Sequence, residues 1–270
     1  MATDGLIGDV TISAAAAISG NTVSAGGTGG ALYAGQGLLS LTVNTGAAIT
    51  GFTAAQGGFA YAGQVIGTVT IADGSSVTSN TATSGGAFLY AGYAVARVLL
   101  TTGSSVSGNG GSAVVFSGGV MGSLELADDS HLHHNTGGGV YAAGVPLADC
   151  PTLAAQVAAL IAGTVAPGQR SEAPVAAVLE AVRGGKAGIG RVSVRGRSSI
   201  HHQQATGAAI SSTAIGGAVG SGGHILGVFV SDSSVYSCGA YSGGVVGSEG
   251  IIANVDIRNG SRLYDNTATM

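Results

Sequence analysis

The sequence predicts an all-β protein, a right-handed parallel β-helix of about eight three-strand coils with an inserted α-helical hairpin. One short sequence motif with an apolar anchor residue recurs eight times, and most anchors are 26 to 35 residues apart. Repeats of that length are typical of a solenoid, in which each repeat buries its apolar face only against its neighbours. Each copy also divides into three short segments separated by turn residues. The anchors are Ile18, Ile49, Val77, Val106, Leu132, Ile200, Val235 and Leu263.

Two apolar residues separated by one position open each copy, eight and six residues before the anchor, as Val69 and Ile71 do. Apolar residues at alternate positions indicate a short strand with one face toward a core. In the Val235 copy the pair is Val228 and Val230, displaced by one position. We expect these pairs from successive copies to form one continuous sheet.

Turn residues and then a small residue follow the first strand. Asp73-Gly74 and Asn259-Gly260 are examples of the turn. The small residue has the same parity as the anchor, so we expect it to face the inside of a narrow corner. These residues are Ala16, Ala47, Ser75, Ser104, Ser130, Ser198, Ser233 and Ser261.

An asparagine usually stands three places after the anchor. Side-chain amides stacked at one bend of successive coils can donate to one neighbour and accept from the next, which satisfies polar groups at a tight corner. We therefore predict a structural ladder of amides that Phe52 interrupts, with Gln203 and Cys238 at two further places. The asparagines are Asn21, Asn80, Asn109, Asn135 and Asn266.

Paired glycines open the third segment in several copies, as in Gly29-Gly30 and Gly57-Gly58. Glycine tolerates the backbone angles of sharp corners, so each pair indicates the bend before another strand. Three strands and three bends complete one coil. Because successive coils lie about 4.8 Å apart, eight coils predict a rod roughly 40 Å long.

One interval, the 68 residues from Leu132 to Ile200, is far too long. All four prolines fall in it, and its apolar residues follow helical spacing. We predict a helical hairpin at residues 145–187, inserted between coils one to five (residues 1–144) and coils six to eight (residues 188–270) of one continuous solenoid domain. The alternative is a disordered or wrongly translated stretch.

The motifs resemble those of a known family. Ile18-Ser19-Gly20-Asn21 with Gly29-Gly30-Ala31-Leu32, and Val77-Thr78-Ser79-Asn80 with Gly85-Gly86-Ala87-Phe88, resemble the repeats of chlamydial polymorphic membrane proteins. The resemblance implies a pectin-lyase-like right-handed β-helix and a surface adhesin of the autotransporter type. The family usually has Phe where this chain has Ile, Val or Leu at the anchor.

The composition excludes several classes of protein. The chain is 45% apolar with 8% charged residues, whereas disordered chains are polar and highly charged. No apolar run is long enough for a membrane-spanning helix. The net charge of −4, with no Lys or Arg before Arg97, leaves no basic stripe, so we expect no nucleic-acid partner.

The residue after each anchor should point away from the core. In the last four copies this file of equivalent positions holds His133, His201, Tyr236 and Tyr264. These residues form a strip of exposed rings if the insertion loops out. Rings with an apolar body and a polar tip could stack on sugars or contact a protein partner. The alternative is a column of rings that merely covers a corner.

Histidines also cluster here, because His131, His134 and His202 join the two histidines of the strip. Imidazole is a common zinc or copper ligand. However, adjacent histidines on a strand point to opposite faces, and no cysteine or carboxylate series completes a site. We therefore predict no metal and no cofactor.

Catalytic residues are not predicted, so we expect a protein that is not an enzyme. Polysaccharide lyases and glycosidases need carboxylates gathered on one face, whereas Asp73, Glu125, Asp232 and Asp256 lie in different coils. A file of threonines suggests ice binding as a minor option, but it does not continue beyond the third coil. Those threonines are Thr11, Thr42 and Thr70.

The function that we expect is a non-enzymatic stalk, adhesin or matrix element, extracellular or at the cell surface. A carbohydrate-binding or polysaccharide-cleaving protein is the alternative, and glycans, surface or matrix proteins and end-to-end self-association are the expected partners. The first residues lack a signal peptide and the last coil lacks its glycine pair, so we expect a truncated chain. Whether Cys150 and Cys238 pair is left open.

Overall fold

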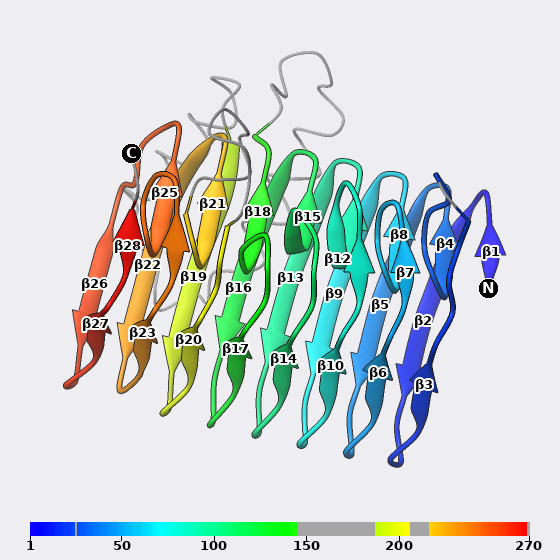
Figure 1. The fold of residues 1–270 in the computed structure, drawn as a ribbon, viewed down its shortest axis with the longest axis horizontal. Coiled ribbons are helices and arrows are strands. Elements are labelled where there is room, and N and C mark those ends of the chain that lie inside the picture. Colours follow the sequence, from blue (N-terminus) through cyan, green and yellow to red (C-terminus); the bar gives the residue numbers. More distant parts are fainter. Residues whose placement is uncertain (25, 145–186, 206–215, 269–270) are drawn as a thin grey trace.

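The computed structural model describes residues 1–24, 26–144, 187–205 and 216–268, and shows an all-β parallel solenoid with three large sheets (Figure 1). Within these residues each large sheet has eight strands, and every strand pair is parallel. A coil takes one strand from each sheet in turn. Seven coils contribute a strand to each of the three sheets, and an eighth is represented at the C-terminal end by one strand in each of two large sheets and by a short corner strand. The prediction of a parallel β-helix with three-strand coils is therefore confirmed.

The strands of a coil follow one another in the order sheet 1, sheet 2, sheet 3. Sheet 1 consists of β2 (Leu6–Ile12), β5 (Gly37–Val43), β9 (Val65–Ile71), β13 (Ala94–Leu100), β16 (Val120–Leu126), β19 (Ala187–Arg195), β22 (His224–Ser231) and β26 (Val255–Arg258). Sheet 2 consists of β3 (Ala17–Ser19), β6 (Ala48–Thr50), β10 (Ser76–Thr78), β14 (Ser105–Ser107), β17 (His131–His133), β20 (Ser199–His201), β23 (Ser234–Tyr236) and β27 (Arg262–Tyr264).

Sheet 3 lies on the remaining side of the coil and begins with a strand that precedes the first coil. It consists of β1 (Ala2–Thr3), β4 (Leu32–Ala34), β8 (Ala60–Ala62), β12 (Gly86–Ala91), β15 (Ala113–Ser117), β18 (Val140–Ala142), β21 (Val219–Ser221) and β25 (Val246–Ser248). Two short pairs lie at the corner between sheets 2 and 3: β7 (Thr53–Ala54) with β11 (Thr81–Ala82), and β24 (Gly239–Ala240) with β28 (Thr267–Ala268).

The core is built from files of like side chains that run along the solenoid. In sheet 1, Leu100 pairs with Ile71 on one side and Leu126 on the other, and all three are almost fully buried. The anchors of sheet 2 form a second file, buried from Ile49 to Val235. Apolar area removed from water in this way stabilises the fold by about 25 cal/mol per Å², and each coil depends on its neighbours for that burial.

The displaced pair of the seventh coil keeps its place in the file. Val228 pairs with Val192, and Val230 pairs with Val194. The connection from β22 to β23 is Asp232-Ser233, one residue shorter than Gly196-Arg197-Ser198 in the coil before. The turn, not the strand, thus absorbs the irregularity in the sequence.

A left-handed residue turns the chain after every strand of sheet 2. The residue two places after the anchor has a positive φ in all eight described copies, from 50° at His202 to 77° at Gly20. This conformation interrupts the alternation of a strand, so the residues one and two places after the anchor both face outward. The residue three places after the anchor then points inward, which is where the asparagines stand.

The predicted helical hairpin at residues 145–187 falls almost entirely outside the described residues. Its last residue, Ala187, begins β19 instead, so the predicted boundary at that end is wrong. The described strands on either side of the insertion pair in the ordinary register, since Leu132 of β17 pairs with Ile200 of β20. In the described residues no helix is long and apolar enough to cross a membrane.

Candidate functional site

Three asparagines and a glutamine form a chain of hydrogen bonds inside the corner between sheets 2 and 3. The Nδ2 of Asn80 donates to Oδ1 of Asn109 at 2.9 Å, and Nδ2 of Asn109 donates to Oδ1 of Asn135 at 3.0 Å. Asn135 in turn donates to Oε1 of Gln203 at 3.2 Å. These side chains are buried, and their oxygens also accept backbone N–H groups of the neighbouring coil. The amides thus satisfy donors that the corner would otherwise leave unpaired.

The two outer asparagines behave differently from the inner three. Phe52 occupies the place next to Asn80 and is fully buried, so it separates Asn21 from the chain of amides. Asn21 is exposed. At the other end, Cys238 interrupts the amides, and Oδ1 of Asn266 accepts from its backbone N–H at 3.0 Å. The ladder is therefore continuous over the middle coils.

The predicted ring strip forms one stacked file on the outside of sheet 2. The ring centroids of His133 and His201 are 4.9 Å apart, those of His201 and Tyr236 are 4.7 Å apart, and those of Tyr236 and Tyr264 are 4.8 Å apart. The planes of successive rings differ by 8°, 4° and 3°. The structure thus brings together all four residues that the sequence grouped.

The stacking of these rings determines which parts of them a ligand can contact. Two coplanar rings cannot lie side by side at 4.8 Å without overlapping, so neighbouring rings must face each other in an offset stack. Each inner ring face is then partly covered by the next ring, and the outer surface includes a row of ring edges with nitrogen and hydroxyl groups. A sugar that needs an open aromatic face finds one most readily on Tyr264 at the end of the file, which is 43% exposed.

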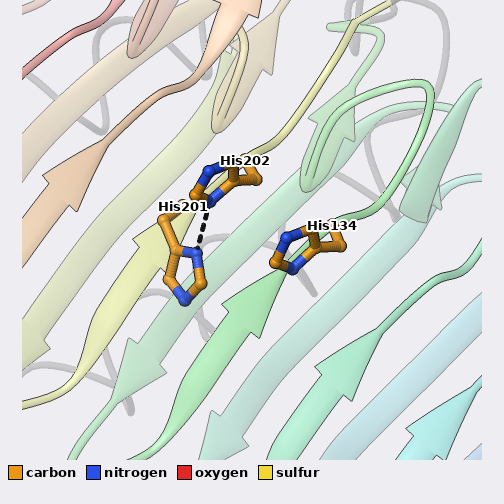
Figure 2. A group of neighbouring side chains, drawn as sticks. All are labelled: His134, His201 and His202. Atoms are coloured by element: carbon orange, nitrogen blue, oxygen red, sulfur yellow. Dashed lines mark hydrogen bonds between the residues drawn. The ribbon is translucent and has the colours of Figure 1, made fainter.

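A second file of imidazoles lies beside the first. The rings of His134 and His202 stack at 4.6 Å between centroids, and Nδ1 of each lies 2.8 Å from Nδ1 of the histidine before it. Figure 2 shows the contact between His201 and His202. Contrary to the prediction from strand geometry, the adjacent histidines at these two corners do not face opposite ways. Both residues follow the end of a strand with φ of 53° and 50°, which turns them to the same outer surface as His133 and His201.

The imidazoles of His133 and His201, the two inner rings of the cluster, are held neutral. Burial, followed by the neighbouring histidines, lowers the pKa of His201 to about 4, and the same causes lower the pKa of His133. The side chains of two serines accept or donate at the edge of the cluster: Ser105 Oγ lies 3.0 Å from Nε2 of His133, and Ser199 Oγ lies 2.8 Å from Nδ1 of His131. At neutral pH each inner ring is therefore an unprotonated imidazole, with one nitrogen that carries a lone pair and one that carries a proton.

Sheet 3 carries a further aromatic file that sequence reasoning missed. Tyr33, Tyr61, Tyr90 and Phe116 stack with centroids 5.2 to 5.5 Å apart and planes within 4° of parallel, and Tyr141 continues the file with a tilted ring. The signal was present in the sequence, since these residues recur at the repeat interval shortly after the glycine pairs. In this file, too, rings cover one another's faces.

Several carboxylates of sheet 1 and its turns are paired with arginines. Glu125 contacts Arg97 at 3.0 Å and Asp256 contacts Arg258 at 2.6 Å. Two further contacts, at 3.0 and 2.6 Å, join Asp129 to Arg197 and lower the pKa of that carboxyl. These pairs belong to different coils and do not converge on a common point. The threonine file also ends as expected, because Thr70 pairs with Leu99 in the next coil.

A cleft of about 580 Å³ opens beside the ring strip near the C-terminal end of the described chain. Its lining includes His202, Gln204, Tyr241 and Asp265. Cys238 also borders it, but this thiol is buried and free. The other cysteine, Cys150, lies outside the described residues.

Comparison with known proteins identifies no relative, since no protein family, curated protein or solved structure matches this chain.

Proposed function

We propose that this chain is a non-enzymatic structural solenoid of the cell exterior, a stalk or matrix element whose task is to hold a rigid extended body. The observation that supports the proposal is that the polar and aromatic side chains stacked along the solenoid contact one another. Amides, serines and rings alike are engaged with the same residue type of the next coil. Side chains committed to coil-to-coil contacts stiffen the stack and leave few groups to act on a substrate.

Pulling the chain by its two ends in a force spectrometer tests load-bearing directly. We expect unfolding in steps of one coil, each releasing roughly 95 Å for about 28 residues, because each coil contacts only its neighbours. Extension without measurable resistance would contradict a structural role. An antibody against the chain that fails to label intact source cells would contradict the cell-exterior assignment.

The absence of catalysis is part of the proposal and is tested separately. Glycoside hydrolysis requires two carboxyl groups facing each other across the scissile bond, whereas Glu125, Asp129 and Asp256 each contact an arginine. Incubation with pectic and algal polysaccharides should release neither new reducing ends nor unsaturated products. Release of either product would overturn this part of the proposal.

Carbohydrate or protein binding, as in an adhesin, is the second candidate. The cleft lined by His202 and Tyr241 favours it, together with the exposed ring of Tyr264 at the end of the ring strip. A glycan array should then show binding that Tyr264→Ala and Tyr241→Ala weaken. Tyr61→Ala is the matched control, because Tyr61 is stacked on both sides and lies in sheet 3.

A further inference from the structure

The cluster on coils five and six contains histidines at the two outward positions of each corner. His133 and His134 come from the end of β17, and His201 and His202 come from the end of β20. Figure 2 shows the rings of His134, His201 and His202 gathered at one spot on the outer surface. The outer rings of His134 and His202 are exposed, so a solute can reach them.

We propose that His134, His201 and His202 form a binding site for one divalent ion of the imidazole-preferring class, Zn²⁺, Cu²⁺ or Ni²⁺. One donor atom from each of the three side chains lies within 4.8 Å of the others. This proposal goes beyond the structural role above and stands or falls independently of it.

The pair from coil six is already close to a chelating arrangement. Nδ1 of His201 and Nδ1 of His202 are 2.8 Å apart. Two ligands at right angles, each about 2.0 Å from a metal ion, are separated by nearly the same distance. When an ion binds, the ring that carries the shared proton at Nδ1 becomes the tautomer protonated at Nε2, so both rings stay neutral. Small rotations then aim the lone pairs of both Nδ1 atoms at the ion.

The third ligand comes from the neighbouring coil. The ring of His134 stacks on that of His202 at 4.6 Å between centroids and is exposed, so rotation of its side chain toward the ion meets little packing resistance. His201, in contrast, lies between the rings of His133 and Tyr236, which fix its plane. One held ligand and two adjustable ligands suit a site that closes on its ion.

The donor set selects the class of ion. Imidazole suits zinc, copper and nickel, whereas calcium and magnesium require oxygen ligands. In the described part of the chain the cluster consists of imidazoles, and the nearby carboxylate of Asp129 is held by Arg197. The ion would join coil five to coil six, across the 68 residues that separate the two anchors.

The test uses the full chain without a histidine tag, stripped with a chelator and titrated with Zn²⁺, Cu²⁺ or Ni²⁺ by calorimetry. We expect one ion per chain and a melting temperature that rises with ion concentration, as ligand linkage requires. Ca²⁺ and Mg²⁺ should have no effect. With Cu²⁺, the electron paramagnetic resonance spectrum should show coupling to several nitrogens.

His134→Gln and His202→Gln remove exposed ligands and should leave the fold intact by circular dichroism. Loss of a supporting group around a metal costs about 10- to 100-fold in affinity, so loss of a ligand should cost at least as much. His224→Gln is the matched control, since His224 lies outside the cluster. Absence of binding at 100-fold excess of each ion, or equal affinity in His202→Gln and the parent chain, would overturn the site while leaving the solenoid untouched.

Discussion

At the scale of single residues, Asn109 offers the clearest test of the amide ladder. Its Oδ1 accepts from both nitrogens of Asn80, and its Nδ2 donates to Asn135. Asn109→Ala leaves buried donors of Asn80 without an acceptor, which costs about 1–3 kcal/mol for each unsatisfied group. We expect the free energy of unfolding by denaturant to fall by at least about 2 kcal/mol.

Asn21→Ala is the control for that measurement, because Asn21 has the same place in its coil but is exposed beyond Phe52. Its free energy of unfolding should change by less than about 0.5 kcal/mol. Equal losses in the two variants would mean that the ladder contributes nothing specific to stability.

The thiol of Cys238 should be almost inert in the folded protein. Burial raises its pKa to about 11, and only 1% of the residue is exposed. Because the thiolate is the reacting form, a raised pKa lowers its fraction at pH 8, and reactivity should keep rising with pH up to about 11. Ellman's reagent tests this on a Cys150→Ser chain, with the urea-unfolded protein as the reference. Rapid labelling of the folded chain at pH 8 would contradict the buried position.

At the scale of the structural element, the corner before sheet 3 requires glycine because it has no room for a side chain at Gly58. A Cβ on Gly58 would lie 2.0 Å from the carbonyl oxygen of Ala87, a contact that only backbone movement can relieve. We expect Gly58→Ala to cost at least about 1–3 kcal/mol, the usual range for overpacking. Thermal denaturation followed by circular dichroism measures the loss.

Gly8→Ala separates the steric effect from the entropic effect of glycine. Neither Gly8 nor Gly58 has a positive φ, but a Cβ on Gly8 meets no atom within 4 Å. Alanine there should leave stability unchanged or raise it slightly, since it restricts the unfolded chain. A comparable loss in both variants would show that close packing at the Gly58 corner is not the cause.

The strands were predictable from the sequence because each has a simple signal. Alternating apolar residues such as Val69 and Ile71 place one face inward, and the turn residues after them mark the corners. The orientation of His134 and His202 was not predictable in the same way. It depends on a positive φ at the residue two places after the anchor. In some other coils a glycine at this position indicates such a conformation, whereas a histidine gives no such indication.

At the scale of the whole molecule, stability should be distributed over the coils, and one coil should be removable. Deleting residues 50–77 joins Ile49 to Thr78, which takes the place of Thr50, its partner in sheet 2. The shortened chain should keep its β-sheet circular dichroism signal and shorten by about 4.8 Å, as X-ray scattering can measure. In this variant Asn21 becomes the neighbour of Asn80 and should join the ladder. A shortened chain that aggregates or loses its sheet signal would show that the coils are not interchangeable.

The overall architecture was predictable from the sequence because the same weak pattern occurs in eight similar copies, whereas a single copy would be ambiguous. The stacking of the rings was not predictable from the sequence. The sequence places His133, His201 and Tyr236 in one file but does not say whether a partner would meet their faces or their edges. That depends on a spacing of 4.7 to 4.9 Å between centroids, which only three-dimensional packing fixes.

The position of the insertion has a consequence for how such a chain can change. Residues 143–186 stand between β18 and β19, where the second coil needs only Gly63-Gln64 to pass from β8 to β9. Each doubling of a connection costs only about 0.6 kcal/mol in closure entropy, and the flanking strands keep their register. This corner is therefore a natural grafting point: a guest sequence of unrelated character can be carried on the rod while the host coils go on folding as before.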